Sequence, residues 1–275
     1  MATWETFESR FVITARLVAA TALRVGAGGE EAAQPAASDL PVILGADDRP
    51  FIPGASLRGV LRSQVERIVR TLEPQAGDGL GACNPVVEQE WCITSKDMDS
   101  LRQQARSQDD PDRWLAEQVW AGSCRVCRVF GSPWLASRVR IADLPLSNGG
   151  DSRIERRDGV SIHREKETVQ NKYDFEAVPA GTSFDLRITL ENLEPAERGL
   201  VWLGLQELRD GHVLLGGFKG RGLGRAELAD LRIEGVEAGD RQALKRYLLQ
   251  RTLLAFSPEE ANRWLEQLLT EMEAN

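Results

Sequence analysis

The sequence lacks the features that mark several classes of protein. No apolar run in its 275 residues approaches the ~20 that a membrane-spanning helix needs, and the start, MATWETFESR, has no secretion signal. We therefore expect a cytoplasmic protein with no membrane partner. Histidine is also scarce, and we interpret His163, in a charged alternating segment, and His212, in a turn, as surface residues.

Net positive charge is missing too. A formal net charge of -8 argues against nonspecific coating of nucleic acid, because such binding scales with the phosphates that Lys and Arg neutralise. The cations are unevenly placed, however. Residues 56–70 carry four arginines against one glutamate, whereas residues 257–275 carry five acids against one arginine. A local basic surface can still bind a polyanion.

One short segment departs from this acidic average. Residues 216–225, GGFKGRGLGR, hold five glycines, three cations and no acid. Glycine lets the backbone approach a ligand closely, and successive N–H groups can form a concave anion site. The segment fits no nucleotide-binding fingerprint, and a flexible turn between strands is the alternative. The candidate phosphate ligands are Gly217, Lys219, Gly220, Arg221, Gly222 and Arg225.

A second candidate lies at the start of a predicted helix in FIPGASLRGVLR. Leu57, Leu61 and Val65 fall at helical spacing, with Ser56 as a plausible N-cap. The free N–H groups and the positive end of the helix dipole would face an anion there. The candidate ligands are Gly54, Ser56, Arg58 and Arg62. We expect this turn to converge in space with the glycine-rich loop.

The remaining chain alternates strand and helix patterns. Alternation predicts a strand over residues 11–17 and an extended β-hairpin at about residues 150–185. The stretch VLLGGFKGRGLGRAELADLRI predicts a strand, a loop and a second strand. Residues 239–273 are predicted to hold the C-terminal helices, the last beginning with a capping box. Residues 73–127 differ in character and indicate an insertion with a small structure of its own.

All four cysteines lie in that insertion, at Cys83, Cys92, Cys124 and Cys127. A reducing compartment makes disulfides an unfavourable interpretation. The C-x-x-C pair at Cys124 and Cys127 suits tetrahedral thiolate zinc, whereas the wider spacing of Cys83 and Cys92 is looser than usual. We predict a structural Zn²⁺ site, with buried free thiols as the alternative.

Four motifs in order carry a family resemblance. They are IPGASLRGVLR, CRVCRVFGSPWLASRVRIADLPL, GVSIHREKETVQNKYDFEAVPAGTSFDL and GGFKGRGLGR. Together they resemble the RAMP superfamily, the repeat-associated proteins of CRISPR effector complexes, and in particular its type III backbone subunits. The resemblance implies an α+β fold for a single domain over residues 1–275. This fold is a modified ferredoxin-like or RNA-recognition-motif core with a thumb β-hairpin and a zinc-knuckle insertion.

The same resemblance implies partners and an activity. The partners are CRISPR RNA, target single-stranded RNA and other CRISPR effector subunits. Active members cut target RNA with an aspartate before the proline-glycine motif, which corresponds to Asp39 here. RNA supplies its own 2′-OH nucleophile, so a carboxylate acting as base or as ligand of Mg²⁺ or Mn²⁺ can suffice.

Three alternatives stay open at this stage. Asp39 can simply cap a turn before Pro41. The chain can be a structural RNA-binding subunit without catalysis, which differs from the active form at Asp39 alone. It can also be the superfamily's precursor-processing endoribonuclease, which shares the glycine-rich loop and often uses a histidine.

Overall fold

An antiparallel sheet of five strands forms the centre of the protein. The computed structural model describes residues 5–26, 38–150, 153–163 and 165–274. The strand order is β2-β5-β1-β6-β7. The strands are β1 (Ser9–Ala19), β2 (Val139–Ile141), β5 (Ser183–Glu191), β6 (Ala226–Glu237) and β7 (Leu254–Phe256). Ile13 of β1 pairs with Ile188 and Ile233, so the alternation along these strands places one apolar row in the core.

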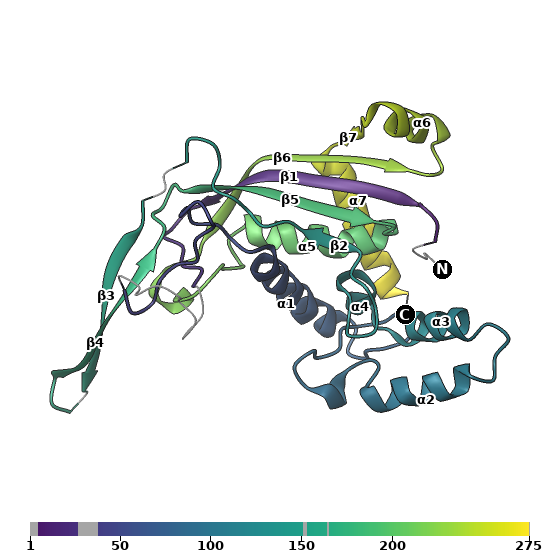
Figure 1. Ribbon diagram of the computed structural model, residues 1–275, viewed down its shortest axis with the longest axis horizontal. Helices are drawn as coiled ribbons and strands as arrows, with labels where there is room; N and C mark the ends of the chain where they lie inside the picture. Colours follow the sequence, from purple (N-terminus) through teal and green to yellow (C-terminus); the bar gives the residue numbers. More distant parts are fainter. Residues whose placement is uncertain (1–4, 27–37, 151–152, 164, 275) are drawn as a thin grey trace.

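Three helices cover one face of this sheet: α1 (Gly54–Leu72), α5 (Pro195–Arg209) and α7 (Pro258–Glu273), as Figure 1 shows. On α1 the stripe Leu57, Leu61 and Val65 is fully buried. The connection β1-α1-β2-β5-α5-β6, with β5 and β1 in the middle of the sheet, is a ferredoxin-like arrangement. The predicted α+β class with this core is therefore confirmed.

A two-stranded hairpin of β3 (Glu155–His163) and β4 (Thr168–Ala177) extends away from the main sheet (Figure 1). At its base, Leu40 pairs with Phe175 and Leu23 pairs with Val178. A small separate core fills this base. Its buried members are Ala22, Phe175, Ala177 and Leu223, with Leu40, Tyr173 and Phe218 packed against them. The hairpin is thus attached to the segment after β1 and to the glycine-rich loop.

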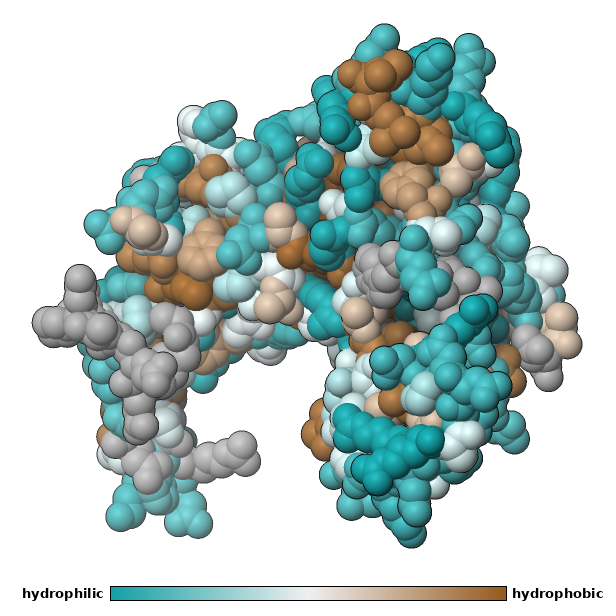
Figure 2. Space-filling model, turned by 45° about the vertical axis from the view of Figure 1, so that its right-hand side comes forward, coloured by the Kyte–Doolittle hydropathy of each residue, from teal (hydrophilic) through white to brown (hydrophobic). Residues whose placement is uncertain are grey.

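The segment between α1 and β2 holds four short helices, η1 (Glu88–Glu90), α2 (Ser95–Ala105), α3 (Pro111–Gly122) and α4 (Arg125–Phe130). The pair α2 and α3 lies away from the main sheet, around Ile93, Met98 and Val119 (Figure 1). In the space-filling view of Figure 2, an open concavity separates the hairpin at the lower left from this helical region at the lower right.

Two local predictions were wrong, the helix N-cap at Ser56 and a strand directly before the glycine-rich loop. Helix α1 begins at Gly54 with Pro53 at the N-cap, and Ser56 lies inside its first turn. The stretch after α5 is a loop leading into η2 (Lys219–Arg221), and β6 begins only at Ala226. Val213 and Leu215 are buried in the core, so their apolar character reflects packing rather than strand pairing.

The face drawn in Figure 2 is mainly hydrophilic, with several hydrophobic areas within it. Helix α6 (Arg241–Gln250) exposes Leu248 and Leu249. Within the described ranges, no helix combines the length and the apolar character that crossing a bilayer requires.

Candidate functional site

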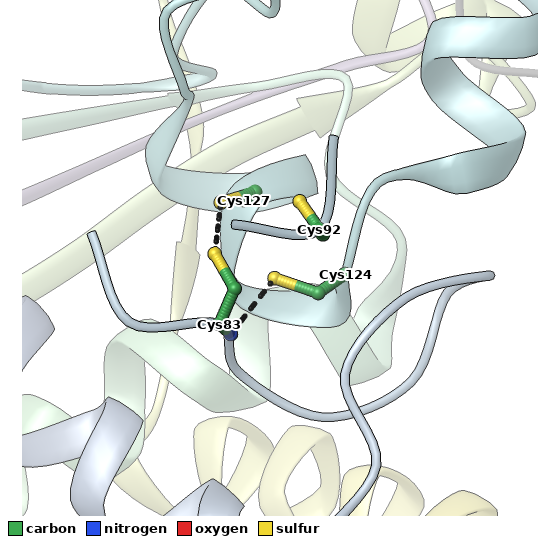
Figure 3. Close-up of side chains that lie close together, drawn as sticks. All are labelled: Cys83, Cys92, Cys124 and Cys127. Carbon is green, nitrogen blue, oxygen red and sulfur yellow. Dashed lines mark hydrogen bonds between the residues drawn. The ribbon is translucent and has the colours of Figure 1, made fainter. Parts of the chain in front are cut away.

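The four cysteines come together although they are widely spaced in the sequence. Their sulfur atoms all lie within 4.8 Å of one another. The Cys83 and Cys127 sulfurs are 3.5 Å apart, and the Cys83 backbone N–H donates to the Cys124 sulfur (Figure 3). Cys124 is the residue before α4 and Cys127 lies within it, so one helical turn presents both thiols.

This donor set suits a tetrahedral zinc ion. Four thiolates at Zn–S distances of about 2.3 Å lie roughly 3.8 Å from one another, close to the spacing seen here. Three of the cysteines are buried and Cys92 is half-buried. Hydrogen bonding to the Cys124 sulfur raises the pKa of both Cys83 and Cys127, and a bound cation would favour their thiolate forms. The cluster could therefore hold a metal ion.

Arginines of α1 support the cysteine cluster. Arg62 donates to the Gly131 carbonyl at 2.9 Å and to the Cys127 sulfur at 3.4 Å. Arg70 donates to the carbonyls of Ala82 and Cys83 at 2.9 and 2.6 Å. The basic face that the sequence predicted on α1 thus largely faces the protein's own backbone.

Arg58, a predicted RNA ligand, also turns toward this region. Its guanidinium donates to the Phe130 carbonyl, and burial, with the neighbouring charge of Arg62, lowers its pKa. Arg58, Arg62 and Cys92 line a cavity of about 430 Å³ beside the cluster. Arg62, whose three guanidinium nitrogens all donate within the protein, has an internal structural role and few donors left for RNA, whereas Arg58 uses one donor internally and its predicted contact with RNA stays a prediction.

A buried ion pair also holds the cysteine-containing insertion against the helices that cover the sheet. Arg125 of α4 donates to both carboxylate oxygens of Glu73, at 3.0 and 2.7 Å. It also reaches Glu271 of α7 at 3.1 Å. Removing one partner of such a pair leaves an uncompensated charge in the interior. Arg125 thus joins the insertion to the C-terminal end of α1, where Glu73 lies, and to α7.

The start of α1 is not an open anion site at its first residue. The Gly54 N–H donates to the Asp143 carboxylate at 2.8 Å. A Cβ at Gly54 would lie only 2.2 Å from the Ile141 carbonyl oxygen, so glycine is required for this close approach. The helix dipole there is already met by a carboxylate of the protein.

The glycine-rich loop is held at its two ends and exposed at its tip. At Gly216, with φ of 73°, a Cβ would lie 2.0 Å from the Arg24 carbonyl oxygen, and the next N–H, of Gly217, donates to that same oxygen at 2.8 Å. The tip forms the short turn η2. The predicted ligands that are exposed are Lys219, Gly220, Arg221, Gly222 and Arg225.

Aromatic and basic side chains that the sequence did not single out surround this loop. Phe218 has a left-handed backbone, with φ of 56°, and carries the guanidinium of Arg24 at 5.3 Å and that of Arg221 at 4.7 Å from its ring centre. Arg221 also donates to the hydroxyl of Tyr173 on β4. Burial, partly offset by Glu176, lowers the pKa of Arg24. The spacing of glycine and lysine within residues 216–225 gives no information on Arg24, because Arg24 lies far away in the sequence.

Asp39 is exposed and fixed against the hairpin. Its Oδ2 accepts the backbone N–H of Asp174 at 3.0 Å, and its own N–H donates to Asp174 Oδ1 at 2.8 Å. Asp174 Oδ2 forms an ion pair with Arg156 of β3. Hydrogen bonding to Arg156 lowers the pKa of Asp174, so this carboxylate stays ionised. Asp174 and Arg156 are further candidate residues that the sequence did not indicate.

Strand β4 contacts two of the three features predicted to act on RNA, namely the glycine-rich loop and Asp39, the third being the Gly54 turn. Tyr173 contacts the glycine-rich loop, and the next residue, Asp174, holds Asp39. Successive side chains of a strand point to opposite faces, so the loop and Asp39 lie on different sides of the same strand. Gly54 instead packs against the backbone at Ile141. The loop and Asp39 thus contact neighbouring residues of β4, whereas the expected convergence of the Gly54 turn with the loop stays a prediction.

Comparison with known proteins identifies the family. The family model described as the RAMP superfamily matches residues 16–227, and no curated protein matches the chain significantly. This match covers most of the chain, so the protein belongs to the RAMP superfamily. Membership implies a CRISPR-associated RNA-binding protein that works in a multi-subunit complex.

Proposed function

We propose that this protein is a backbone subunit of a type III CRISPR interference complex, which binds CRISPR RNA and cleaves target RNA complementary to it. The observation that carries this proposal is the position of Asp39. Its carboxylate is exposed and held by the base of a hairpin that also contacts the glycine-rich loop. A phosphate-binding loop and a fixed carboxylate on one strand suit the cutting of a bound RNA strand.

Guide RNA is bound through its phosphates at the glycine-rich loop. Lys219, Arg221 and Arg225 are exposed around backbone turns with positive φ at Gly222 and Gly224. The N–H groups of Gly222 and Gly224 already donate to the carbonyls of Lys219 and Ala22, so the exposed cationic side chains, rather than these amides, would contact the phosphates. Phosphate contacts position the RNA, whereas base pairing between guide and target supplies sequence specificity. Binding should therefore vary little with the sequence of the guide.

The β3–β4 hairpin acts as the thumb that separates nucleotides along the guide. It extends beside the concavity in Figure 2 and exposes Val160 and Val169. These apolar side chains can contact bases that have lost a stacking neighbour. A displaced nucleotide in the target has the freedom that attack by its own 2′-OH requires.

Asp39 supplies the protein's part of the chemistry. Its Oδ1 has no hydrogen-bond partner within the described part of the chain, whereas Oδ2 is held by Asp174. A single free carboxylate oxygen fits Mg²⁺ or Mn²⁺, which bind proteins through one or two carboxylates together with substrate phosphates. When bound, such an ion would neutralise charge on the phosphate. Asp39 then orients the ion or accepts the 2′-OH proton directly.

The cysteine cluster holds a structural Zn²⁺ and does not take part in cleavage. The four sulfur atoms lie within 4.8 Å of one another and Arg62 of α1 donates to the Cys127 sulfur, so four protein ligands would complete a tetrahedral structural site. The ion would stabilise the insertion, whose own apolar cluster around Ile93, Met98 and Val119 is small.

The two other functions predict different behaviour. A purely architectural subunit would bind guide RNA and never cut. A precursor-processing endoribonuclease would cut repeat RNA as an isolated chain, and often with a histidine. His163 pairs with Thr168 near the far end of the hairpin, and His212 follows α5 beside Glu207. In the described part of the chain, neither histidine has a hydrogen bond or ion pair with Asp39 or with the tip of the glycine-rich loop, which favours the backbone subunit.

The experiment that tests the proposal compares three RNAs. The isolated chain, and the chain assembled with its partner subunits and a guide, are each mixed with complementary RNA, with noncomplementary RNA and with repeat RNA, with and without Mg²⁺. We expect cutting of complementary RNA alone and only with the metal. Binding without any cutting would establish the architectural role, and cutting of repeat RNA by the isolated chain would establish the processing enzyme.

A further inference from the structure

Asp174 fixes the position of the Asp39 carboxylate. The two aspartates exchange hydrogen bonds, each carboxylate accepting the other's backbone N–H, at 2.8 and 3.0 Å. They are separated by 135 positions in the sequence. This exchange fixes the Asp39 carboxylate through Oδ2 and leaves Oδ1 directed elsewhere. The position of Asp39 is therefore set by the hairpin as well as by its own loop.

Arg156 completes the arrangement on the neighbouring strand. Its guanidinium pairs with Asp174 Oδ2 through one terminal nitrogen. The side chain is 59% exposed, and its remaining N–H donors have no partner in the described parts of the protein. An arginine fork held at one end by a carboxylate presents its other donors in a fixed direction. Phosphate is the anion that such a fork binds best in RNA.

We propose that Asp174 positions Asp39 and Arg156 as one unit, in which Arg156 is a further catalytic residue that binds the scissile phosphate of the target RNA. This inference rests on the proposed cleavage function. It adds a hairpin residue to the reaction and a reason why the hairpin and the cutting loop are joined. Asp174 acts through the other two residues, whereas Arg156 contacts the substrate.

The reaction can be written with all atoms accounted for. The proton of the target 2′-OH passes to Asp39 Oδ1, and O2′ attacks the adjacent phosphorus. The bond from phosphorus to O5′ breaks, O5′ takes a proton from water, and the hydroxide that remains takes the proton held by Asp39, which restores the carboxylate. The products are a 2′,3′-cyclic phosphate and a 5′-hydroxyl. Charge that develops on the nonbridging phosphate oxygens is stabilised by Arg156, whose guanidinium is already oriented.

Single-turnover cleavage by the assembled complex tests this proposal. Five variants are compared with the unchanged protein: Asp39→Ala, Arg156→Ala, Arg156→Lys, Asp174→Ala and Asp174→Asn. Arg157→Ala is the matched control, because Arg157 is the next residue on β3 and pairs with Glu155 rather than with Asp174. Guide and target binding are measured for every variant, so a loss of rate is separated from a loss of affinity.

We expect Arg156→Ala and Asp174→Ala to lower the cleavage rate by about 100-fold while target affinity changes little, since removing one transition-state donor costs this much. Arg156→Lys keeps the charge and Asp174→Asn keeps an acceptor for the Asp39 N–H, so both should recover part of the rate. Arg157→Ala should cut like the unchanged protein.

The outcomes separate this inference from the proposed function. If Asp39→Ala cuts normally, the proposed cleavage site itself is wrong. If Asp39→Ala is inactive while Arg156→Ala and Asp174→Ala cut at the normal rate, the cleavage site stands and the role of the hairpin pair is refuted. Equal losses for Arg156→Ala and Arg157→Ala would also refute it, because they would reflect general charge rather than this geometry.

Discussion

The cysteine region and the hairpin base use arginine in opposite ways. Beside the cysteines, the side chains of Arg62 and Arg125 are 15% and 10% exposed, and their donors are taken by carbonyls, carboxylates and a sulfur. At the hairpin base, Arg156 and Arg221 are exposed and keep donors to spare. A count of arginines in the sequence therefore does not locate an RNA surface. Burial and existing partners decide which arginines can serve it.

The same contrast applies to stability. Burying a charge is costly unless it is paired, so the buried pairs of the cysteine region fix the fold strongly once they form. Exposed pairs such as that of Arg157 and Glu155 contribute little, because water screens them and the side chains lose entropy. We expect changes in the first region to unfold the protein and changes in the second to alter function without unfolding it.

Loss of the metal should have the largest effect. Cys124→Ser removes a buried ligand at the start of α4, and a chelator can approach through the cavity that Cys92 lines. We expect about one zinc per chain before either treatment and none after it. The melting temperature should fall by roughly 10 °C or more. A metal-free protein with an unchanged melting temperature would show that the thiols are simply buried residues.

Breaking the Glu73–Arg125 ion pair should have the second-largest effect on stability. Glu73 is 6% exposed at its side chain, and Glu73→Ala would leave Arg125 buried with only Glu271 as a partner. The free energy of unfolding should drop by about 3 to 5 kcal/mol in denaturant titrations. The control is Glu155→Ala in the exposed pair, which should cost under about 1 kcal/mol. Equal losses for the two variants would remove the distinction between the regions.

Two arginine variants test the division of roles directly. Arg62→Ala should lower the free energy of unfolding by about 2 kcal/mol, because it removes hydrogen bonds to Gly131 and Cys127, and should leave guide RNA affinity unchanged. Arg221→Ala should weaken guide RNA binding about tenfold for every guide sequence and leave stability unchanged. Fluorescence titration and chemical denaturation measure both quantities. A reversed result would place the RNA surface on α1.

A change of pH should have the smallest effect. Because Arg156 lowers the pKa of Asp174, the ionised carboxylate stabilises the hairpin contact at pH values above the ordinary aspartate pKa of about 3.9. That contribution is lost as the pH falls through the lowered pKa of the folded protein. The amide resonances of Asp39 and Asp174 should therefore stay unchanged between about pH 7 and pH 5. Movement of both resonances in that interval would contradict the ion pair.

Part of this account can be predicted from the sequence. Alternating residues such as Phe11, Ile13 and Leu17 predict a strand because sheet side chains alternate between core and surface. The C-x-x-C pair predicts thiols that suit a metal ion, and Cys124 and Cys127 do lie within one turn at the start of α4, close to the other two cysteines. These features depend on residues close together along the chain, so local patterns suffice.

The rest depends on contacts that no local pattern encodes. The sequence does not show that α1 turns Arg58 and Arg62 toward the cysteine segment, since both lie beside the apolar stripe of the helix. It also gives no sign that Asp39 meets Asp174, or that Arg24 lies over Phe218. Such contacts are set by how the sheet and the hairpin pack, and only the folded chain shows them.

The most direct test of the account is cleavage by the assembled complex carrying Asp39→Ala. We expect this variant to bind guide and complementary RNA like the unchanged protein, to melt at the same temperature, and to cut at least about a thousandfold more slowly. Cleavage at the normal rate would contradict the assignment of Asp39 and, with it, the view that the hairpin base is the functional region of this protein.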